Sequence, residues 1–563
     1  MKKFITIAVV FLLLVSCSGP KTKADSILFN GKIYTVDSAF SIQEALVIEN
    51  GKIIYCGNSE TALDKYEAGS IINLEQKVVF PGFIDAHCHF YGYGKGLNEL
   101  NFVNSKSYQE IIQLLISYAK ENNLFPENSA IKLNEANWII GRGWDQNDWG
   151  NKEFPDKTKL DSLFPNTPVL LKRIDGHAIL VNQKALNIAG FSEQTKINGG
   201  ELIIKNGKLS GILIDNAGDS LEKFIPKSAK EIVIKALLRA QDSCIKVGLT
   251  TIDDAGLEKN IIDAIDELQQ SHKLKIKIYA MLSPTPENIH YYLKNGVYKT
   301  ERLNICSFKF YADGALGSRG ACLKKVYNDK KDWQGFLLND ISYFKKFAEM
   351  LAPTKFQMNT HCIGDSAGKI ILDIYSMYCK SSNKRWRIEH AQIIDETEFK
   401  KFNKDIIPSV QPTHATSDMY WAENRIGKER MAGAYAYKKL LQSAGIIALG
   451  TDFPVEHISP FKTFYAAVVR KDAQNYPKNG FQTVDALTRV ETLKGMTIWA
   501  AYSNFEEKEK GSLEVGKFAD FIILDQDLML CKEKEIMNTK VLNTFINGEE
   551  VYSVKGTQKK SNP

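Results

Sequence analysis

Eight short apolar runs, separated by segments with a helical pattern, fill the middle of this 563-residue chain. Amphipathic segments such as 231–246, 341–351 and 368–378 lie between the runs. Strands that alternate with helices predict an α/β fold, and eight such units predict a (β/α)₈ TIM barrel with its active site at the carboxyl ends of the strands. The runs are 78–90, 247–254, 274–282, 306–313, 356–361, 387–390, 406–411 and 446–452.

The ends of these runs carry residue types that bind divalent metals. His87 and His89 are two residues apart, so their side chains share one face of a strand. The others are Lys309, which becomes a ligand type if CO₂ carbamylates it, His361, His390 and Asp452. Each alone also fits packing or a local ion pair, but their shared position at strand ends favours a metal centre. Imidazole and carboxylate ligands suit zinc, with iron, manganese or nickel as alternatives.

The two ends of the chain contain short alternating strands with Asn-Gly turns, which are typical of hairpins. Segments 26–76 and 512–555 therefore predict one small β-sandwich domain built from both termini. Residues 77–511 are assigned to the barrel. A large insertion at 98–240 follows the first strand.

The N-terminus resembles a bacterial lipoprotein signal. Lys2 and Lys3 precede an apolar run at 4–15 that is too short to span a bilayer. The run leads into Ser16 and Cys17, so we expect a signal peptide at 1–16, a lipid on Cys17 and a polar linker at 17–25. The alternative is an ordinary secretory signal or an N-terminal anchor. Lipidation predicts attachment to a bacterial membrane in the cell envelope, on the periplasmic or outer-membrane side, rather than a cytoplasmic location.

Composition is typical of a globular protein of the size of an enzyme, with 44% hydrophobic and 25% charged residues. The net charge of +6 is mild and the lysines are dispersed, which argues against binding to nucleic acid. The cysteines have no regular spacing, so no disulfide framework is assigned. The sequence does not distinguish a monomer from a homodimer.

Longer phrases around these residues occur in one fixed order: 81–89, 143–147, 175–178, 313–319, 361–365, 389–390, 411–419 and 450–454. In this order they resemble the amidohydrolase superfamily, and they are similar in particular to its amidohydrolase 3 group. The phrases extend over most of the chain. The one departure is Thr451, where the family often has Ser.

The resemblance implies a metal-dependent hydrolase that cleaves carbon–nitrogen bonds other than peptide bonds in a small amide, an N-acyl amine or an N-formyl amine. His87, His89, His361 and His390 would hold one or two ions, with carbamylated Lys309 bridging two. The metal would lower the pKa of a bound water and polarise the carbonyl. Asp452 would act as the catalytic base and as a ligand.

Five further residues are candidates for substrate binding: Trp144, Asp145 and His177 in the insertion, Asp313, and His414 after the seventh strand. For the insertion residues, the alternative is that they pack and cap the insertion's own fold. Two other functions remain open from the residues alone. One is a deaminase or cyclic-amide hydrolase with the same metal ligands. The other is a surface lipoprotein that binds a ligand without turnover, against which Asp452 argues because binding needs no base.

Overall fold

The computed structural model describes residues 20–122, 138–380 and 382–554. At its centre lies a sheet of eight parallel strands in sequence order, which confirms the predicted barrel. The strands are β8 (Phe83–Cys88), β15 (Leu249–Leu257), β16 (Lys277–Leu282), β18 (Leu303–Tyr311), β19 (Gln357–Cys362), β20 (Trp386–His390), β21 (Ile406–Val410) and β22 (Ala448–Leu449). The short β17 (Tyr298–Lys299) pairs with β18 outside this order.

The first and last strands meet just beyond the end of β22. The backbone N–H of Asp452 donates to the carbonyl of His87 at 2.7 Å, and that of His89 donates to the carbonyl of Phe453 at 2.8 Å. Gly450 makes this approach possible, because a Cβ at this position would lie 2.5 Å from the backbone nitrogen of His87. We call this junction of β8 with residues 450–453 the seam of the barrel.

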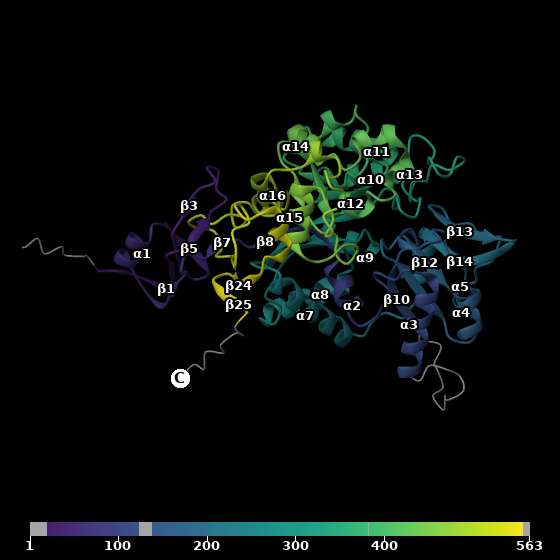
Figure 1. Ribbon diagram of the computed structural model, residues 1–563, viewed down its shortest axis with the longest axis horizontal. Coiled ribbons are helices and arrows are strands. Elements are labelled where there is room, and N and C mark those ends of the chain that lie inside the picture. Colours follow the sequence, from purple (N-terminus) through teal and green to yellow (C-terminus); the bar gives the residue numbers. More distant parts are fainter. Residues whose placement is uncertain (1–19, 123–137, 381, 555–563) are drawn as a thin grey trace, which may run out of the picture.

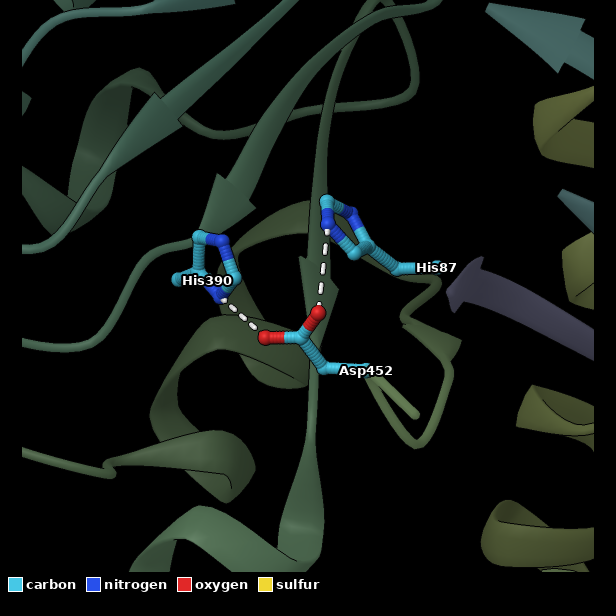
Figure 2. A group of neighbouring side chains, drawn as sticks. All are labelled: His87, His390 and Asp452. Carbon is cyan, nitrogen blue, oxygen red and sulfur yellow. Dashed lines mark ion pairs between the residues drawn. The ribbon is translucent and has the colours of Figure 1, made fainter. Parts of the chain in front are cut away.

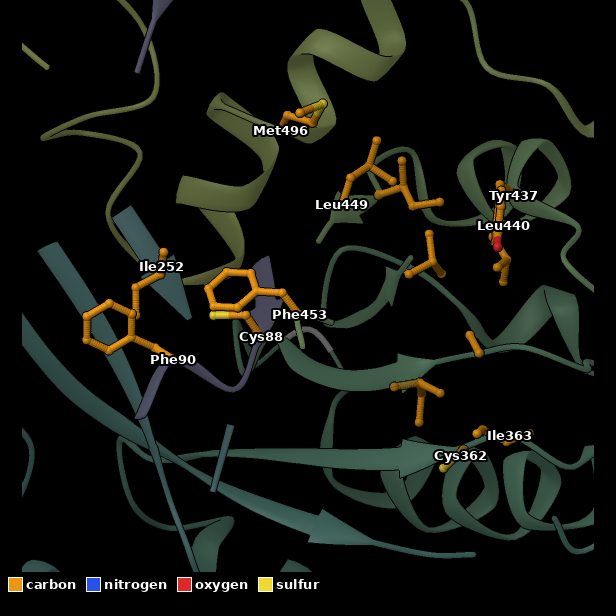
Figure 3. Packing of buried hydrophobic residues seen from close by; sticks show 14 of the residues in the cluster. Cys88, Phe90, Ile252, Cys362, Ile363, Tyr437, Leu440, Leu449, Phe453 and Met496 are labelled. Atoms are coloured by element: carbon orange, nitrogen blue, oxygen red, sulfur yellow. The ribbon is translucent and has the colours of Figure 1, made fainter. Parts of the chain in front are cut away.

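Helices lie around the barrel (Figure 1). In α8, the residues Ile261, Ile265 and Leu268 recur at helical spacing and are buried. Burial of each such side chain contributes about 1.5–3 kcal/mol. Figure 3 shows part of this core, where Leu449 of β22 lies near Met496. The helices are α2 (Phe90–Gly96), α7 (Lys230–Lys246), α8 (Lys259–Gln270), α9 (Pro286–Asn295), α10 (Ile341–Leu351), α11 (Asp365–Tyr378), α12 (Pro412–Asp418), α13 (Ala422–Ile426), α14 (Tyr437–Ala444), α15 (Pro460–Val469), α16 (Arg489–Gly495) and α17 (Ile498–Ser503).

Strands from the two ends of the chain share one sheet, in the order β25-β24-β23-β7-β2-β3, which packs on a second sheet, β5-β4-β1-β6. In Figure 1 the purple and yellow strands lie side by side at one end of the molecule. The elements are β1 (Thr22–Phe29), β2 (Lys32–Tyr34), β3 (Ile42–Gln43), β4 (Ala45–Glu49), β5 (Lys52–Gly57), α1 (Ser59–Lys65), β6 (Tyr66–Asn73), β7 (Val78–Pro81), β23 (Phe521–Leu524), β24 (Val541–Ile546) and β25 (Glu549–Ser553).

The sequence pattern suggested that the run at 78–90 is one strand. In the structure it forms two strands. Its first part, β7, pairs with β2 and β23 in the terminal sheet, and its second part, β8, opens the barrel. Gly82 lies at the break, where an added Cβ would lie 2.3 Å from Thr250. Pro81 and Gly82 therefore mark the passage of the chain from one sheet to the other.

The segment between β8 and β15 forms a sheet of its own, in the order β13-β14-β12-β11-β10-β9. It lies at the opposite end of the molecule from the terminal strands (Figure 1). The elements are β9 (Leu100–Asn101), α3 (Tyr108–Glu121), β10 (Ile139–Trp144), α4 (Thr158–Leu163), β11 (Val169–Arg173), β12 (Ala178–Val181), α5 (Gln183–Ala189), β13 (Gly200–Lys205), β14 (Lys208–Asp215) and α6 (Asn216–Glu222).

The predicted signal peptide and the lipidated Cys17 lie outside the described residues, so the anchor stays a prediction. Strand β1 begins at Thr22, so residues 22–25 of the predicted linker at 17–25 belong to a strand. Among the described residues, no helix is both long enough and apolar enough to span a membrane.

Candidate active site

His87, His390 and Asp452 converge at the carboxyl end of the barrel strands (Figure 2). Each offers a ligand atom, and these atoms lie within 4.8 Å of one another. His87 belongs to β8 and His390 ends β20, while Asp452 follows β22. Oδ1 of Asp452 is buried and accepts no hydrogen bond from any described residue. A buried carboxylate oxygen that accepts no hydrogen bond and faces imidazoles is the chemistry that a divalent cation satisfies, so the residues fit a metal ion.

The other three predicted ligands lie next to this group. Nε2 of His89 is 3.3 Å from Oδ1 of Asp452, and Nζ of Lys309 is 3.1 Å from Nε2 of His87. The rings of His361 and His390 have centroids 4.5 Å apart. The parallel register of the strands brings these residues to the same end, since His361 pairs with Glu389 and Cys362 with His390. All six predicted ligands therefore share one site.

Three of the histidines are oriented by a hydrogen bond from Nδ1. The acceptors are Oε2 of Glu389 for His87 at 2.5 Å, the carbonyl of Ala255 for His89 at 3.1 Å, and Oε1 of Gln411 for His390 at 2.8 Å. With Nδ1 occupied, the Nε2 atoms of His87 and His89 face Oδ1 of Asp452, at 3.8 and 3.3 Å, and are available to a cation. In His390 it is Nδ1 that lies 4.0 Å from Oδ2 of Asp452.

The backbone is left-handed at two of the ligands. His390 has φ of +69° and Asp452 has φ of +63°, and Ala391 beside the former has φ of +41°. Such conformations cost about 1–3 kcal/mol for residues other than glycine and concentrate at functional sites. The strands end in these turns, which supports a functional reading of His390 and Asp452.

Behind His87 lies a buried charged network that the sequence reasoning missed. Glu389 forms an ion pair with Arg387 at 2.7 Å, and Arg387 forms another with Asp253 at 2.8 Å. Burial raises the pKa of Glu389, but Arg387 and then His87 outweigh it and hold the pKa well below its usual range. Glu389 is thus a carboxylate that fixes the orientation of His87. The phrase Glu389-His390 was visible in the sequence, but Arg387 and Asp253 carried no local signal.

Asp85 ties the seam together. Its carboxylate accepts hydrogen bonds from the backbone N–H and the hydroxyl of Thr451, at 2.9 and 2.7 Å, and from the N–H of His87 at 3.2 Å. Burial raises the pKa of Asp85 to about 7. One side chain therefore holds both the strand that carries His87 and the turn that carries Asp452.

Burial and neighbouring side chains together set the charge states of the residues in this site. It lowers the pKa of His87 to about 4 and that of Lys309 to about 8. Burial also raises the pKa of Asp452, but contacts with His414 and His89 hold it well below its usual range. Neutral imidazoles beside an ionised carboxylate are the forms that bind a cation.

A cavity of about 540 Å³ opens over this site and is lined by Asp145, His177 and His414. His414 contacts Oδ2 of Asp452 at 3.3 Å and Glu456 at 3.1 Å. Burial lowers the pKa of His414, but the bonds to both carboxylates raise it to about 10. Asp145 forms an ion pair with Arg173 at the cavity wall. These three candidates face the space where a substrate would lie.

The other two candidates, Trp144 and Asp313, do not line this cavity. Trp144 is fully buried in the core of the insertion, where its Nε1 donates to the carbonyl of Leu171 at 2.8 Å. Asp313 is also buried, and its carboxylate accepts from the backbone N–H groups of Cys322, Ile363 and Gly364. The expectation that Trp144 and Asp313 bind substrate is therefore corrected, because one packs the insertion and the other fixes the loop after His361.

Comparisons with known proteins show which sequences and structures are similar to this chain. The sequence model of the Amidohydrolase family matches residues 70–552. The YtcJ protein of Bacillus subtilis, whose name describes an amidohydrolase, is 30% identical over 94% of this chain and 99% of its own length. The N-substituted formamide deformylase of Arthrobacter pascens is 22% identical over 95% of this chain and 99% of its own. A metal-dependent hydrolase of Pyrococcus horikoshii has a similar structure, with a TM-score of 0.73 and 27% identity, covering 90% of this chain and 99% of that one.

Proposed function

This chain belongs to the amidohydrolase family and is a metal-dependent hydrolase by its fold, and from this premise we propose that it cleaves carbon–nitrogen bonds other than peptide bonds in small amides, such as N-acyl or N-formyl amines. The similarity to an N-substituted formamide deformylase supports this substrate class. The observation that carries the proposal is the position of Asp452, whose buried Oδ1 accepts no hydrogen bond and lies 3.8 Å from Nε2 of His87 and 3.3 Å from Nε2 of His89.

We propose zinc as the metal, held by His87, His89, His361, His390 and Asp452, because imidazole and carboxylate ligands suit it. When bound, the ion supplies a water of lowered pKa and polarises the carbonyl of the substrate. Lys309 is buried beside His87, and its pKa of about 8 keeps part of the amine neutral and able to react with CO₂. Carbamylation of Lys309 would provide the bridge between two ions.

Asp452 is placed to move the proton. It takes one proton from the attacking water and delivers it to the leaving nitrogen, so that an amide and water become a carboxylic acid and an amine. His414 and Asp85 hold the residue and its turn in position. The side chain of Asp145 and the ring of His177 line the space for the substrate.

A panel of N-formyl and N-acetyl amines tests the substrate class, with elemental analysis of the same purified protein. We expect release of the free amine and one to two divalent ions per chain. Release of ammonia from amino-substituted heterocycles, without amide hydrolysis, would instead favour a deaminase. Active protein with less than about a tenth of an equivalent of any transition metal would contradict the metal centre.

The Asp452→Asn variant separates catalysis from binding. Asn keeps the size of the side chain but cannot accept the proton, so turnover should fall by about two to four decades. If the metal content also falls, Asp452 is a ligand as well. Asp263→Asn on the exposed face of α8 is the matched control and should leave turnover unchanged. Wild-type turnover in Asp452→Asn would remove this residue from the mechanism.

A further inference from the structure

Arg142 of β10 brings a positive charge from the insertion sheet to the cavity over the metal site. It lines that cavity and also an adjoining one of about 660 Å³. Gly96 of α2 leaves room for the arginine, because an added Cβ at Gly96 would lie 3.1 Å from Cδ of Arg142. Nη2 of Arg142 donates to the carbonyls of Pro454 at 3.2 Å and Ile174 at 3.4 Å. Since Pro454 follows Asp452 by two residues, the guanidinium group lies beside the turn that carries the proposed base.

The other two nitrogens of this guanidinium group, Nε and Nη1, donate to no described residue. Neither is among the buried polar atoms that lack a hydrogen bond, so both are open to the cavities that Arg142 lines. Burial lowers the pKa of Arg142, and the charges of Glu99 and Asp452 do not fully offset this effect. Within the described part of the chain, no carboxylate forms an ion pair with Arg142, so its charge is free to attract a ligand.

Most acidic side chains of the cavity over the metal site already have partners. The partners are Arg173 for Asp145 and Asp175, the hydroxyl of Tyr435 for Asp418, and His414 for Glu456. Asp452 belongs to the metal site, and Asp148 is exposed. Lys462 of α15 also lines this cavity and forms no ion pair with the described residues. Arg142 and Lys462 are therefore the basic side chains that remain to meet an anionic group of a ligand.

A half-buried guanidinium group without a carboxylate partner is suited to bind an anion. Its N–H groups form charge-assisted hydrogen bonds with a carboxylate, about twice as strong as those between neutral groups. Nη1 of Arg142 can donate to such a carboxylate while Nη2 keeps its bonds to the two carbonyls. Because these bonds already hold the side chain in place, little conformational freedom is lost when a ligand binds.

Resting on the proposed amide hydrolysis, we propose that Arg142 binds a free carboxylate of the substrate while the scissile amide lies at the metal site. The preferred substrates are then amides that carry a carboxylate on a short chain, such as N-formyl or N-acetyl amino acids. If Arg142 were only a clamp between the insertion and the turn after Asp452, charged and neutral substrates would depend on it equally.

Kinetics on paired substrates test this subsite. The pairs are N-formyl and N-acetyl amino acids with about one to four carbons between nitrogen and carboxylate, and the corresponding carboxamides. The wild-type enzyme should show a kcat/KM about ten- to hundredfold higher for the carboxylate, mainly through KM. Arg142→Gln should lose this preference, and Arg142→Lys, which keeps the charge, should retain part of it. An equal loss on both members of each pair in Arg142→Gln would overturn the subsite and leave Arg142 as a clamp.

Arg302→Gln is the matched control for these variants. Arg302 is also half-buried and donates to a backbone carbonyl, that of Lys275, but it precedes β18 at the end of the strand opposite Lys309. This variant should keep the full preference for the carboxylate. Loss of the preference in Arg302→Gln would mean that any lost arginine lowers it, which would overturn the assignment to Arg142.

A binding measurement separates this proposal from the proposed function. The ligands are N-methanesulfonyl derivatives of the same amino acids and carboxamides, in which a sulfonyl group replaces the scissile carbonyl. Calorimetric titration of the wild-type holoenzyme should show about ten- to hundredfold tighter binding of the carboxylate, and Arg142→Gln should remove this difference. That result without hydrolysis of any amide would overturn the hydrolysis alone. Equal binding of both ligands by the wild type, or an unchanged difference in Arg142→Gln, would overturn the carboxylate subsite.

Discussion

Glu389 is the single residue on which the position of His87 depends most directly. It accepts the hydrogen bond from Nδ1 of His87 at 2.5 Å and is itself held by Arg387. In the Glu389→Gln variant the charge is lost and the hydrogen bond is weakened, so His87 becomes less basic and less well oriented. We expect the affinity for zinc to fall about ten- to hundredfold.

Competition with a chromophoric chelator measures this affinity. The thermal midpoint, recorded in parallel, shows whether Arg387 tolerates the change. Glu509→Gln, at an exposed ion pair with Lys299, is a matched control that should bind zinc as the wild type does. Unchanged zinc affinity in folded Glu389→Gln would mean that the network does not tune the metal site.

For single residues, the sequence predicted the ligands at the ends of strands but not the residues that support these ligands. His87, His361, His390 and Asp452 stand at the ends of apolar runs, so position and residue type could be read together. Arg387 lies inside a strand, and its partner Asp253 is distant in sequence. Their contact depends on the closed barrel. Trp144 was misassigned because the sequence does not show whether a tryptophan at the end of a strand faces a cavity or a core.

Among the structural elements, the seam between β8 and residues 450–453 depends most on one small residue, Gly450. Gly450→Ala would place a methyl group 2.5 Å from the backbone nitrogen of His87 and 2.7 Å from Oδ1 of Asp85. Because backbone must move to relieve this contact, we expect a loss of about 1–3 kcal/mol in the free energy of unfolding, together with lower metal occupancy.

Thermal or urea unfolding and elemental analysis measure the two effects. Gly368→Ala in α11 is the control, because its added methyl meets Ile394 at an ordinary 3.4 Å. A Gly450→Ala protein with wild-type stability and full metal content would show that the seam can widen without consequence.

Element order was the part of the fold that the sequence predicted best. Eight apolar runs correspond to eight barrel strands, and the helix expected at 341–351 is α10. The run at 78–90 was read as one strand, because apolar composition does not tell which sheet a strand joins. The chain passes between the two sheets at Gly82, where it lies so close to Thr250 that an added Cβ would be 2.3 Å away, and the sequence does not show this approach.

For the whole molecule, a buried ion pair joins the terminal sheet to the end of the barrel away from the metal. Nζ of Lys277, at the start of β16, lies 2.7 Å from Oδ2 of Asp520, just before β23, and both are buried. Asp520→Asn leaves Lys277 without a counter-ion, so we expect a loss of about 3–5 kcal/mol in the free energy of unfolding.

Adding Lys277→Met to this variant removes the uncompensated charge. The double variant should therefore regain most of the lost stability, which urea unfolding of the three proteins would show. Equal stability of wild type and Asp520→Asn would mean that the two parts of the molecule are held together without this pair.

The seam also determines when, during synthesis of the chain, the metal site can form. A growing chain presents His87 and His89 early, gains Lys309, His361 and His390 as the barrel lengthens, and receives Asp452 only with the eighth strand. Strand β23, which pairs with β7 beneath the first barrel strand, arrives later still. A chain interrupted before residue 446 would carry every histidine of the centre and yet have no turn to complete it. The candidate metal centre is therefore incomplete until the eighth barrel strand and the turn after it have been synthesised.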